Sequence, residues 1–177
     1  MLKKNKSTRL LLSLLLIVAF LGVVGYVTAR LEYAMYPRHY EGSVTRYASE
    51  YGVPEYIVYS VIYVESGFVR DAVSEKGACG LMQLMPETYG WLVETQGAQK
   101  GDIFDADENI KYGTLYLGML YKKYGDWTHA LCAYNAGSGN VDKWLGESLF
   151  EIPFAETKNY VKKLEVVTER YRRLYYR

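Results

Sequence analysis

Residues 65–86 read ESGFVRDAVSEKGACGLMQLMP, and the fold is organised around this stretch. A carboxylate ends one predicted helix, a loop punctuated by glycines follows, and a second apolar segment carries an amide at Gln83. The first helix begins near Pro54, which suits a first helical position because its missing N–H needs no partner there. Ser66 and Gly67 end that helix, since glycine readily adopts the left-handed conformation found at helix ends.

Glu65 lies on the apolar face of this predicted helix. At about 100° per residue it shares that face with Val58, Val61 and Ile62. Burial disfavours the charged form of a carboxyl group and raises its pKa. A carboxyl group that is protonated near neutral pH is what a general acid requires. The sequence therefore indicates Glu65 as a candidate catalytic acid, the alternative being an ordinary glutamate at a helix end.

Three segments together resemble the lytic murein transglycosylases of the soluble-transglycosylase type. They read ESGF at 65–68, SEKGACGLMQLMP at 74–86 and AYNAG at 133–137, and they occur in the order of that family. The resemblance implies an all-α, lysozyme-like fold of the goose-type lysozyme kind. Gly67 stands where the family often has a larger polar residue, which changes the end of the helix and leaves the chemistry intact.

The resemblance also implies an activity on peptidoglycan glycan strands. These enzymes cleave the β-1,4 bond between N-acetylmuramic acid and N-acetylglucosamine and leave a 1,6-anhydromuramoyl end. The N-acetyl group of the substrate takes the place of a protein nucleophile. Carried over to this sequence, the resemblance implies Glu65 as acid and base. It implies a substrate-binding set of Ser74, Gln83, Met85, Tyr134, Asn135 and Tyr160.

An ordinary glycoside hydrolase uses a second carboxylate, and three candidates follow Glu65 along the chain. Asp71 and Glu75 lie in a polar loop, and Asp105 precedes a helix as a turn or capping residue. None of them has the apolar setting of Glu65, so a mechanism with one carboxylate is favoured. A lysozyme-like hydrolase and a cell-wall-binding module without catalysis are the alternatives.

Composition narrows the range of ligands. The 177 residues carry a formal net charge of +1, which gives no argument for a nucleic-acid partner. The 19 tyrosines suit a carbohydrate groove, because a tyrosine ring stacks on the C–H face of a sugar, although most should pack in the core. No metal-ligand motif occurs, so we expect neither a metal nor a cofactor. Cys79 and Cys132 are expected to be buried free thiols, a disulfide being the alternative.

The N-terminus has the pattern of a membrane anchor or an export signal. Cationic residues precede Leu10–Val27, which is apolar apart from Ser13 and about as long as a bilayer core requires. Because the cleavage site that follows is weak, we expect residues 1–29 to remain as a single-pass anchor. Positively charged residues that flank a membrane span stay on the cytoplasmic side. A connector at 30–40 would then lead to a catalytic domain at 41–177 on the extracytoplasmic side.

Helical spacing of apolar residues predicts the rest of the chain, and no strand pattern of any length appears. Asp107 and Asp126 are expected to cap helices at their N-termini. The predicted helices cover 42–52, 54–65, a short segment from 80, 86–96, 107–125, 126–137, a short turn from 140, and a last helix from 155.

Overall fold

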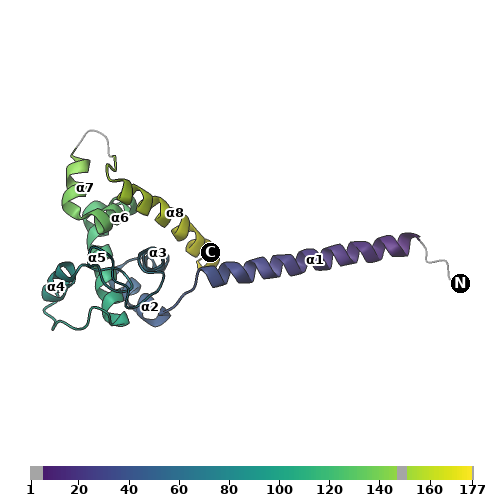
Figure 1. Ribbon diagram of the computed structural model, residues 1–177, viewed down its shortest axis with the longest axis horizontal. Coiled ribbons are helices and arrows are strands. Elements are labelled where there is room, and N and C mark those ends of the chain that lie inside the picture. The colour runs from purple at the N-terminus through teal and green to yellow at the C-terminus, as the bar shows by residue number, and fades with distance from the viewer. Residues whose placement is uncertain (1–5, 147–150, 177) are drawn as a thin grey trace. The chain divides into compact units, whose positions relative to one another are not determined.

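The computed structural model describes residues 6–146 and 151–176 (Figure 1). The chain divides between Pro37 and Arg38 into two compact units, which are described separately. The first contains one long helix, and the second contains the three motifs of the sequence analysis, from Glu65 to Gly137. The candidate site therefore belongs to the second unit alone.

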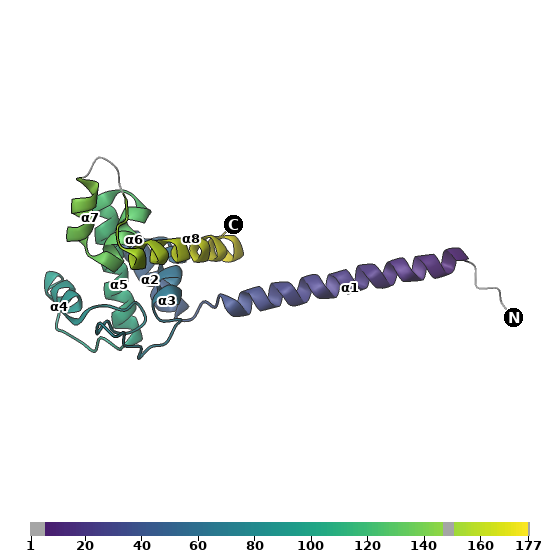
Figure 2. The ribbon, with the colours of Figure 1, turned by 45° about the horizontal axis from the view of Figure 1, so that its top comes forward.

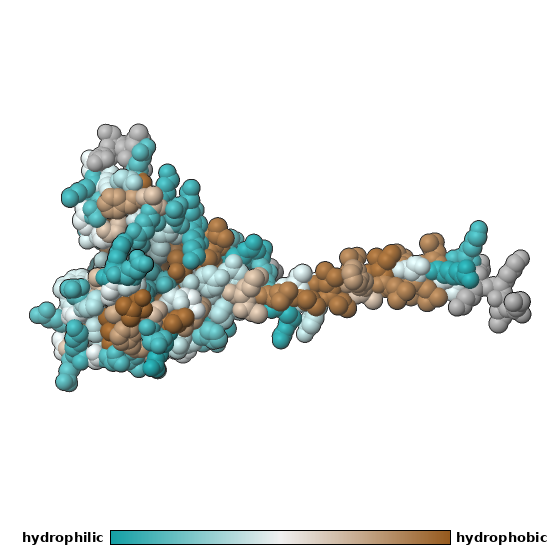
Figure 3. Space-filling view, in the orientation of Figure 1, coloured by the Kyte–Doolittle hydropathy of each residue, from teal (hydrophilic) through white to brown (hydrophobic). Residues whose placement is uncertain are grey.

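Helix α1 spans Lys6–Met35, and its apolar side chains form a nearly continuous surface (Figure 3). The segment Thr8–Met35 is long and apolar enough to cross a membrane. The most apolar stretch of 18 residues within it contains no buried residue. The helix continues past residue 29 into the stretch expected as a connector. It does so because the first helix-breaking residue after the span is Pro37.

The second unit is all-α, as predicted. Residues 38–146 and 151–176 contain no strand, and their only β-type pairs are two isolated bridges at Cys79. Most predicted helices are confirmed, with ends shifted by a few residues. The helices are α2 (Glu41–Tyr51), α3 (Glu55–Glu65), α4 (Pro86–Thr95), α5 (Ala106–Tyr124), α6 (Trp127–Ala136), α7 (Ser138–Leu145) and α8 (Ala155–Tyr175).

Helix α5 packs against α2, α4 and α6, and α6 in turn packs against α7 and α8 (Figures 1 and 2). Its apolar stripe is fully buried at Ile110 and Leu117. Gly118 allows α2 to approach closely, since an added Cβ would lie 2.8 Å from the carbonyl oxygen of Tyr51. These contacts form the core that supports the ends of α3 and α6.

Helices α3 and α8 pack side by side through tyrosines. Tyr59 stacks on Tyr171 with ring centroids 5.5 Å apart, and Tyr56 meets Tyr176 edge to face. Val61 faces the core with no exposed surface. Because early residues of α3 meet late residues of α8, the helices run antiparallel. The C-terminus of α3 therefore lies beside the N-terminal half of α8.

Three details of the sequence analysis were wrong. Pro54 precedes α3 as its N-cap residue rather than starting the helix. Asp105, and not Asp107, caps α5 by accepting hydrogen bonds from the N–H groups of residues 107 and 108. Asn140 lies within α7, which begins directly after Gly137. At α5 and α7 the capping residue stands two and three positions before the residue that the pattern favoured, whereas at α3 Pro54 itself is the cap.

The short helix expected from Gly80 is a turn instead. Cys79 forms bridges with both Val73 and Leu84, which closes the chain on itself. Gly80 and Gln83 both adopt the left-handed region, with φ of 80° and 51°. A right-handed helix cannot pass through two such residues. The turn places Gln83 at its tip, between the loop after α3 and the start of α4.

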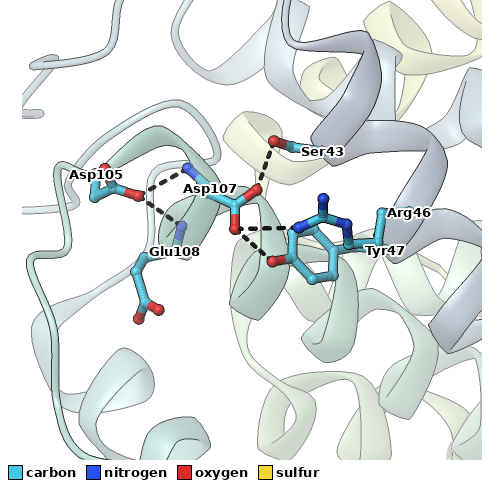
Figure 4. A network of polar contacts seen from close by, with 6 residues as sticks. All are labelled: Ser43, Arg46, Tyr47, Asp105, Asp107 and Glu108. Atoms are coloured by element: carbon cyan, nitrogen blue, oxygen red, sulfur yellow. Dashed lines mark hydrogen bonds and ion pairs between the residues drawn. The ribbon is translucent and has the colours of Figure 1, made fainter.

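Asp107 joins α2 to α5 (Figure 4). Its carboxylate accepts hydrogen bonds from the hydroxyls of Ser43 at 2.6 Å and Tyr47 at 2.5 Å, and Arg46 lies 3.9 Å away. Burial alone would raise the pKa of Asp107, but these hydrogen bonds and the nearby cation outweigh it, so the pKa is lowered. A lowered pKa means that the charged carboxylate stabilises the folded state above the pKa of the unfolded chain.

We expect Asp107→Asn to lower the free energy of unfolding by about 1–2 kcal/mol at pH 7, because the amide turns an N–H toward one of the two hydroxyl donors. The loss should shrink as the pH falls through the pKa of Asp107. Urea denaturation at several pH values measures it. Glu94→Gln, at an exposed position on α4, is the matched control. Equal effects of the two variants at pH 7 would contradict the interpretation.

Candidate active site

Glu65 is the last residue of α3, where the helix ends against α8. The hydroxyl of Tyr160 donates a hydrogen bond of 2.7 Å to its Oε1. Burial raises the pKa of Glu65 to about 7, and it outweighs the hydrogen bond from Tyr160 and the charge of Lys163, which both lower the pKa. The negative charge of Glu156 adds to the upward shift. The pKa of Glu65 thus lies well above that of an ordinary glutamate, which allows the group to hold a proton near neutral pH.

A cavity of about 380 Å³ opens beside Glu65. Its walls come from the end of α3, the loop before α4, the end of α6 and the start of α8. Segments that lie as much as ninety positions apart in the sequence thus meet around one carboxyl group. The lining residues are Glu65, Ser74, Glu75, Lys76, Ala78, Gln83, Met85, Tyr134, Asn135 and Glu156.

The side-chain amide of Gln83 is held in place by two backbone carbonyl groups. Its side-chain amide donates to the carbonyl oxygens of Ala72 at 3.1 Å and Gly80 at 2.9 Å. Both N–H bonds of the amide are then used, so the amide oxygen is the atom left to contact a ligand. Gln83 therefore offers the cavity a hydrogen-bond acceptor, which suits an N–H or O–H group of a ligand.

The turn that carries Gln83 is held from two sides. The N–H of Met82 donates to Asn109 Oδ1 at 2.7 Å, and its carbonyl accepts from the Tyr134 hydroxyl at 2.8 Å. Asn109 is fully buried and also donates to the carbonyl of Cys79 at 3.1 Å. Gly80 is required here, since an added Cβ would lie 2.3 Å from the Asn109 amide nitrogen.

The other residues predicted from the sequence lie at or behind the cavity wall. Ser74 lines the cavity and accepts a hydrogen bond from the N–H of Ala78 at 3.0 Å. Asn135 Oδ1 accepts from the hydroxyl of Thr157 at 2.8 Å, which leaves its amide N–H groups for other partners. Met85 is 38% exposed at the rim. Tyr160 is buried and contacts Glu65 rather than lining the cavity.

Sequence reasoning missed a charged pair at the mouth of the cavity. Lys76 Nζ lies 2.7 Å from the carboxylate of Glu156, and both side chains are largely exposed. The two residues are eighty positions apart, so no local pattern could have predicted the pair. Asn109 was also missed, because a polar residue next to an apolar one is the ordinary pattern of an amphipathic helix and does not reveal that the side chain is buried.

The structure confirms the expected capping role of Asp105 and adds one carboxylate to the cavity that the sequence analysis did not consider. Of the three candidates for a second catalytic carboxylate, Glu75 lines the cavity, Asp71 lies outside its walls and Asp105 caps α5. Glu156, which was not a candidate, lines the cavity as well. Among the described residues, Glu65 is the cavity carboxylate that combines burial with a hydrogen bond from a buried phenol.

Cys79 and Cys132 are both buried and free, as expected. Burial raises the pKa of both thiols, to about 11 for Cys132. No group of metal-binding side chains occurs among the described residues.

A family model described as the transglycosylase SLT domain matches residues 43–152, which include every motif that lines the cavity. The chain belongs to this SLT-domain family. The soluble lytic murein transglycosylase of Escherichia coli K12 is 33% identical over 151 residues, covering 77% of this chain and 23% of that protein. The membrane-bound lytic murein transglycosylase C of Shigella sonnei is 30% identical and covers 76% of this chain and 46% of that protein.

Solved structures of SLT-domain proteins confirm the lysozyme-like fold. The 70 kDa soluble lytic transglycosylase of Escherichia coli superposes with a TM-score of 0.75 at 31% identity, over 80% of this chain and 25% of that one. Its complex with bulgecin A gives a TM-score of 0.77 at the same identity, over 82% of this chain and 26% of that one. The chain thus spans about a quarter of these relatives and about half of the membrane-bound one.

We expect Tyr160→Phe to raise the pKa of Glu65 above about 7, because the lost hydrogen bond stabilises the carboxylate. Glu156→Gln should lower it, because a repulsive charge is removed. Titration of the Glu65 side-chain carbon by NMR in protein labelled at glutamate measures both shifts. Glu165→Gln, also on α8, is the matched control and should leave the pKa unchanged. A lower pKa in Tyr160→Phe would contradict the assigned role of the hydrogen bond.

Proposed function

We propose that this protein is a peptidoglycan lytic transglycosylase. It cleaves the β-1,4 bond between N-acetylmuramic acid and N-acetylglucosamine and leaves a 1,6-anhydromuramoyl end. The observation that carries the proposal is the buried Glu65 in the wall of a cavity, hydrogen-bonded to Tyr160 and with a pKa that burial raises. The names of its SLT-domain relatives support the same substrate.

One residue performs both proton transfers in this mechanism. Protonated Glu65 donates its proton to the glycosidic oxygen as the bond to the muramic acid C1 breaks. The carbonyl oxygen of the substrate's N-acetyl group bonds to C1 in place of a protein carboxylate. The Glu65 carboxylate then takes the proton of the C6 hydroxyl, and the C6 oxygen displaces the acetamido oxygen at C1. The sugar closes on itself, and Glu65 is protonated again.

The neighbours of Glu65 suit these steps. The hydrogen bond from Tyr160 stabilises the carboxylate that forms after the first proton transfer. The acceptor oxygen of Gln83 and the free amide N–H groups of Asn135 are suited to the hydroxyl and acetamido groups of the glycan. A structural relative, the lytic transglycosylase Slt of Pseudomonas aeruginosa, was solved as an inactive mutant with glutamate replaced by glutamine, which supports an essential glutamate in this family.

Glu65→Gln should lower turnover of purified peptidoglycan by about 10⁴-fold or more, because general acid–base assistance contributes about 10²–10⁴ and one residue supplies it twice. The amide preserves size and hydrogen bonding, so folding and glycan binding should survive. Release of soluble muropeptides, resolved by mass spectrometry, measures the loss. Asp71→Asn, whose side chain lies outside the cavity, should stay within a few fold of the parent.

The same product analysis separates the lyase from a lysozyme-like hydrolase. An anhydro end on the released muropeptides supports the lyase, and a reducing muramic acid end supports the hydrolase. The hydrolase would use Glu75 or Glu156 as its second carboxylate. If Glu75→Gln or Glu156→Gln were as inactive as Glu65→Gln while still folded, the mechanism with one carboxylate would be wrong.

We further propose that α1 anchors the SLT domain to the membrane with the domain on the extracytoplasmic side. Its length and composition, its cationic start and the membrane-bound relative support this placement. The first residues of the protein recovered from washed membranes should include the cationic segment before Leu10. N-terminal sequencing tests this, and a mature start at Arg30 would instead mean that the segment is a cleaved export signal.

A further inference from the structure

A buried hydroxyl group lies behind the cavity wall, on the first turn of α8. Thr157 is the third residue of this helix and is only 2% exposed. Its hydroxyl donates a hydrogen bond of 2.8 Å to Oδ1 of Asn135, near the end of α6. Asn135 lines the cavity beside Glu65, whereas Thr157 does not. Thr157 therefore contacts the site through Asn135.

The hydroxyl of Thr157 decides which end of the Asn135 amide faces the cavity. A side-chain amide keeps almost the same shape when its oxygen and nitrogen are exchanged, so its hydrogen-bond partners set its orientation. In the observed orientation the buried hydroxyl hydrogen has an acceptor. After a half-turn the amide nitrogen would donate to the Thr157 oxygen, and the hydroxyl hydrogen would lose that acceptor, which is costly for a buried donor. The orientation with the N–H groups turned away from Thr157 is therefore the stable one.

The orientation of Asn135 matters because Gln83 lines the same cavity. Both N–H bonds of the Gln83 amide are used by backbone carbonyl groups, so Gln83 presents an acceptor oxygen. Asn135 presents N–H donors. An acetamido group contains one N–H donor and one carbonyl acceptor, so a wall that offers both kinds of partner suits it. If Asn135 were reversed, both amides would present oxygen, and the acetamido carbonyl would lose its donor.

The first turns of α8 are held on both sides of Thr157. Glu156 pairs with Lys76 at 2.7 Å, and the hydroxyl of Tyr160 donates to Glu65 at 2.7 Å. Residues 156, 157 and 160 thus contact the loop before α4, the end of α6 and the end of α3. These contacts fix the position of the Thr157 hydroxyl relative to Asn135.

We propose that Thr157 is a positioning residue, which holds the Asn135 amide with its N–H groups toward the cavity and thereby favours sugars that carry an acetamido group. The inference rests on the proposed function, because it requires a glycan in the cavity. Thr157 acts on the substrate only through Asn135. Its removal should therefore weaken substrate binding and leave the proton transfers of Glu65 unaffected.

Steady-state kinetics of matched variants test the inference. The full-length protein in detergent is assayed on peptide-free peptidoglycan glycan strands of about eight sugars. Thr157→Val keeps the shape of the side chain and removes the hydroxyl, so it should raise KM about 3- to 10-fold, the effect of one hydrogen bond, and change kcat less than about 2-fold. Thr157→Ser keeps the hydroxyl and should restore most of the loss. Thr114→Val, which removes a buried hydroxyl on α5 outside the cavity walls, is the matched control and should leave KM unchanged.

A double-mutant cycle separates positioning from a purely structural role. In protein that already carries Asn135→Ala, Thr157→Val should raise KM no further, because the amide that it positions is gone. Additive effects on KM would mean that Thr157 only stabilises α8, and they would overturn the inference. An unchanged KM of Thr157→Val, or a loss confined to kcat, would overturn it as well.

Asn135→Asp decides the question if Thr157→Val does not fold. One carboxylate oxygen accepts from Thr157 as before, and the other presents an acceptor to the cavity in place of the N–H groups. KM should then rise at least 3-fold, and an unchanged KM would refute the inference. A parent protein that releases no fragment from the strands would refute the proposed function and this inference with it. An active parent whose KM does not respond to these variants would refute the inference alone.

Discussion

The hydrogen bond between Tyr160 and Glu65 is the contact on which the site depends. It joins the last residue of α3 to a residue in the first third of α8, across the antiparallel pair of helices. The bond can form only if the two helices keep a fixed register. Contacts between tyrosine rings set that register, with Tyr59 stacked on Tyr171 at one level and Tyr56 edge to face with Tyr176 near the far end.

The second constraint is the turn at residues 79–83. Gln83 is held in a left-handed conformation that costs a non-glycine residue free energy. Asn109 from α5 and Tyr134 from α6 offset that cost, because Asn109 accepts a hydrogen bond from the N–H of Met82 and Tyr134 donates one to the carbonyl oxygen of Met82. Tyr134 therefore has two roles: its hydroxyl stabilises the turn through a hydrogen bond, and the residue also lines the cavity wall.

Local signals in the sequence were enough to predict most of the helices and to single out Glu65, whereas the other residues of the site came from the resemblance to a known family. The apolar face ending at Glu65, the proline that begins α4 and the cap at Asp126 each act within a few residues, so they can be read from the chain. The turn at Gly80 could not, because its second left-handed residue is a glutamine that gives no such signal. The pair of Lys76 and Glu156 depends on the approach of α8 to the loop before α4, which only the tertiary structure supplies.

The burial of Glu65 also lowers the stability of the domain at neutral pH. The pKa of Glu65 is about 7 in the folded protein, whereas the ordinary value for a glutamate, as in the unfolded chain, is 4.5. The folded state thus holds this proton more tightly than the unfolded chain does, so the contribution of Glu65 to stability is greatest below pH 4.5 and falls as the pH rises to about 7. Since one pKa unit corresponds to about 1.4 kcal/mol, the loss is on the order of 3 kcal/mol. That cost arises from the same burial that keeps the acid protonated. The tyrosine packing between α3 and α8 has to offset it, because a looser interface would admit water and return the carboxyl group to an ordinary pKa.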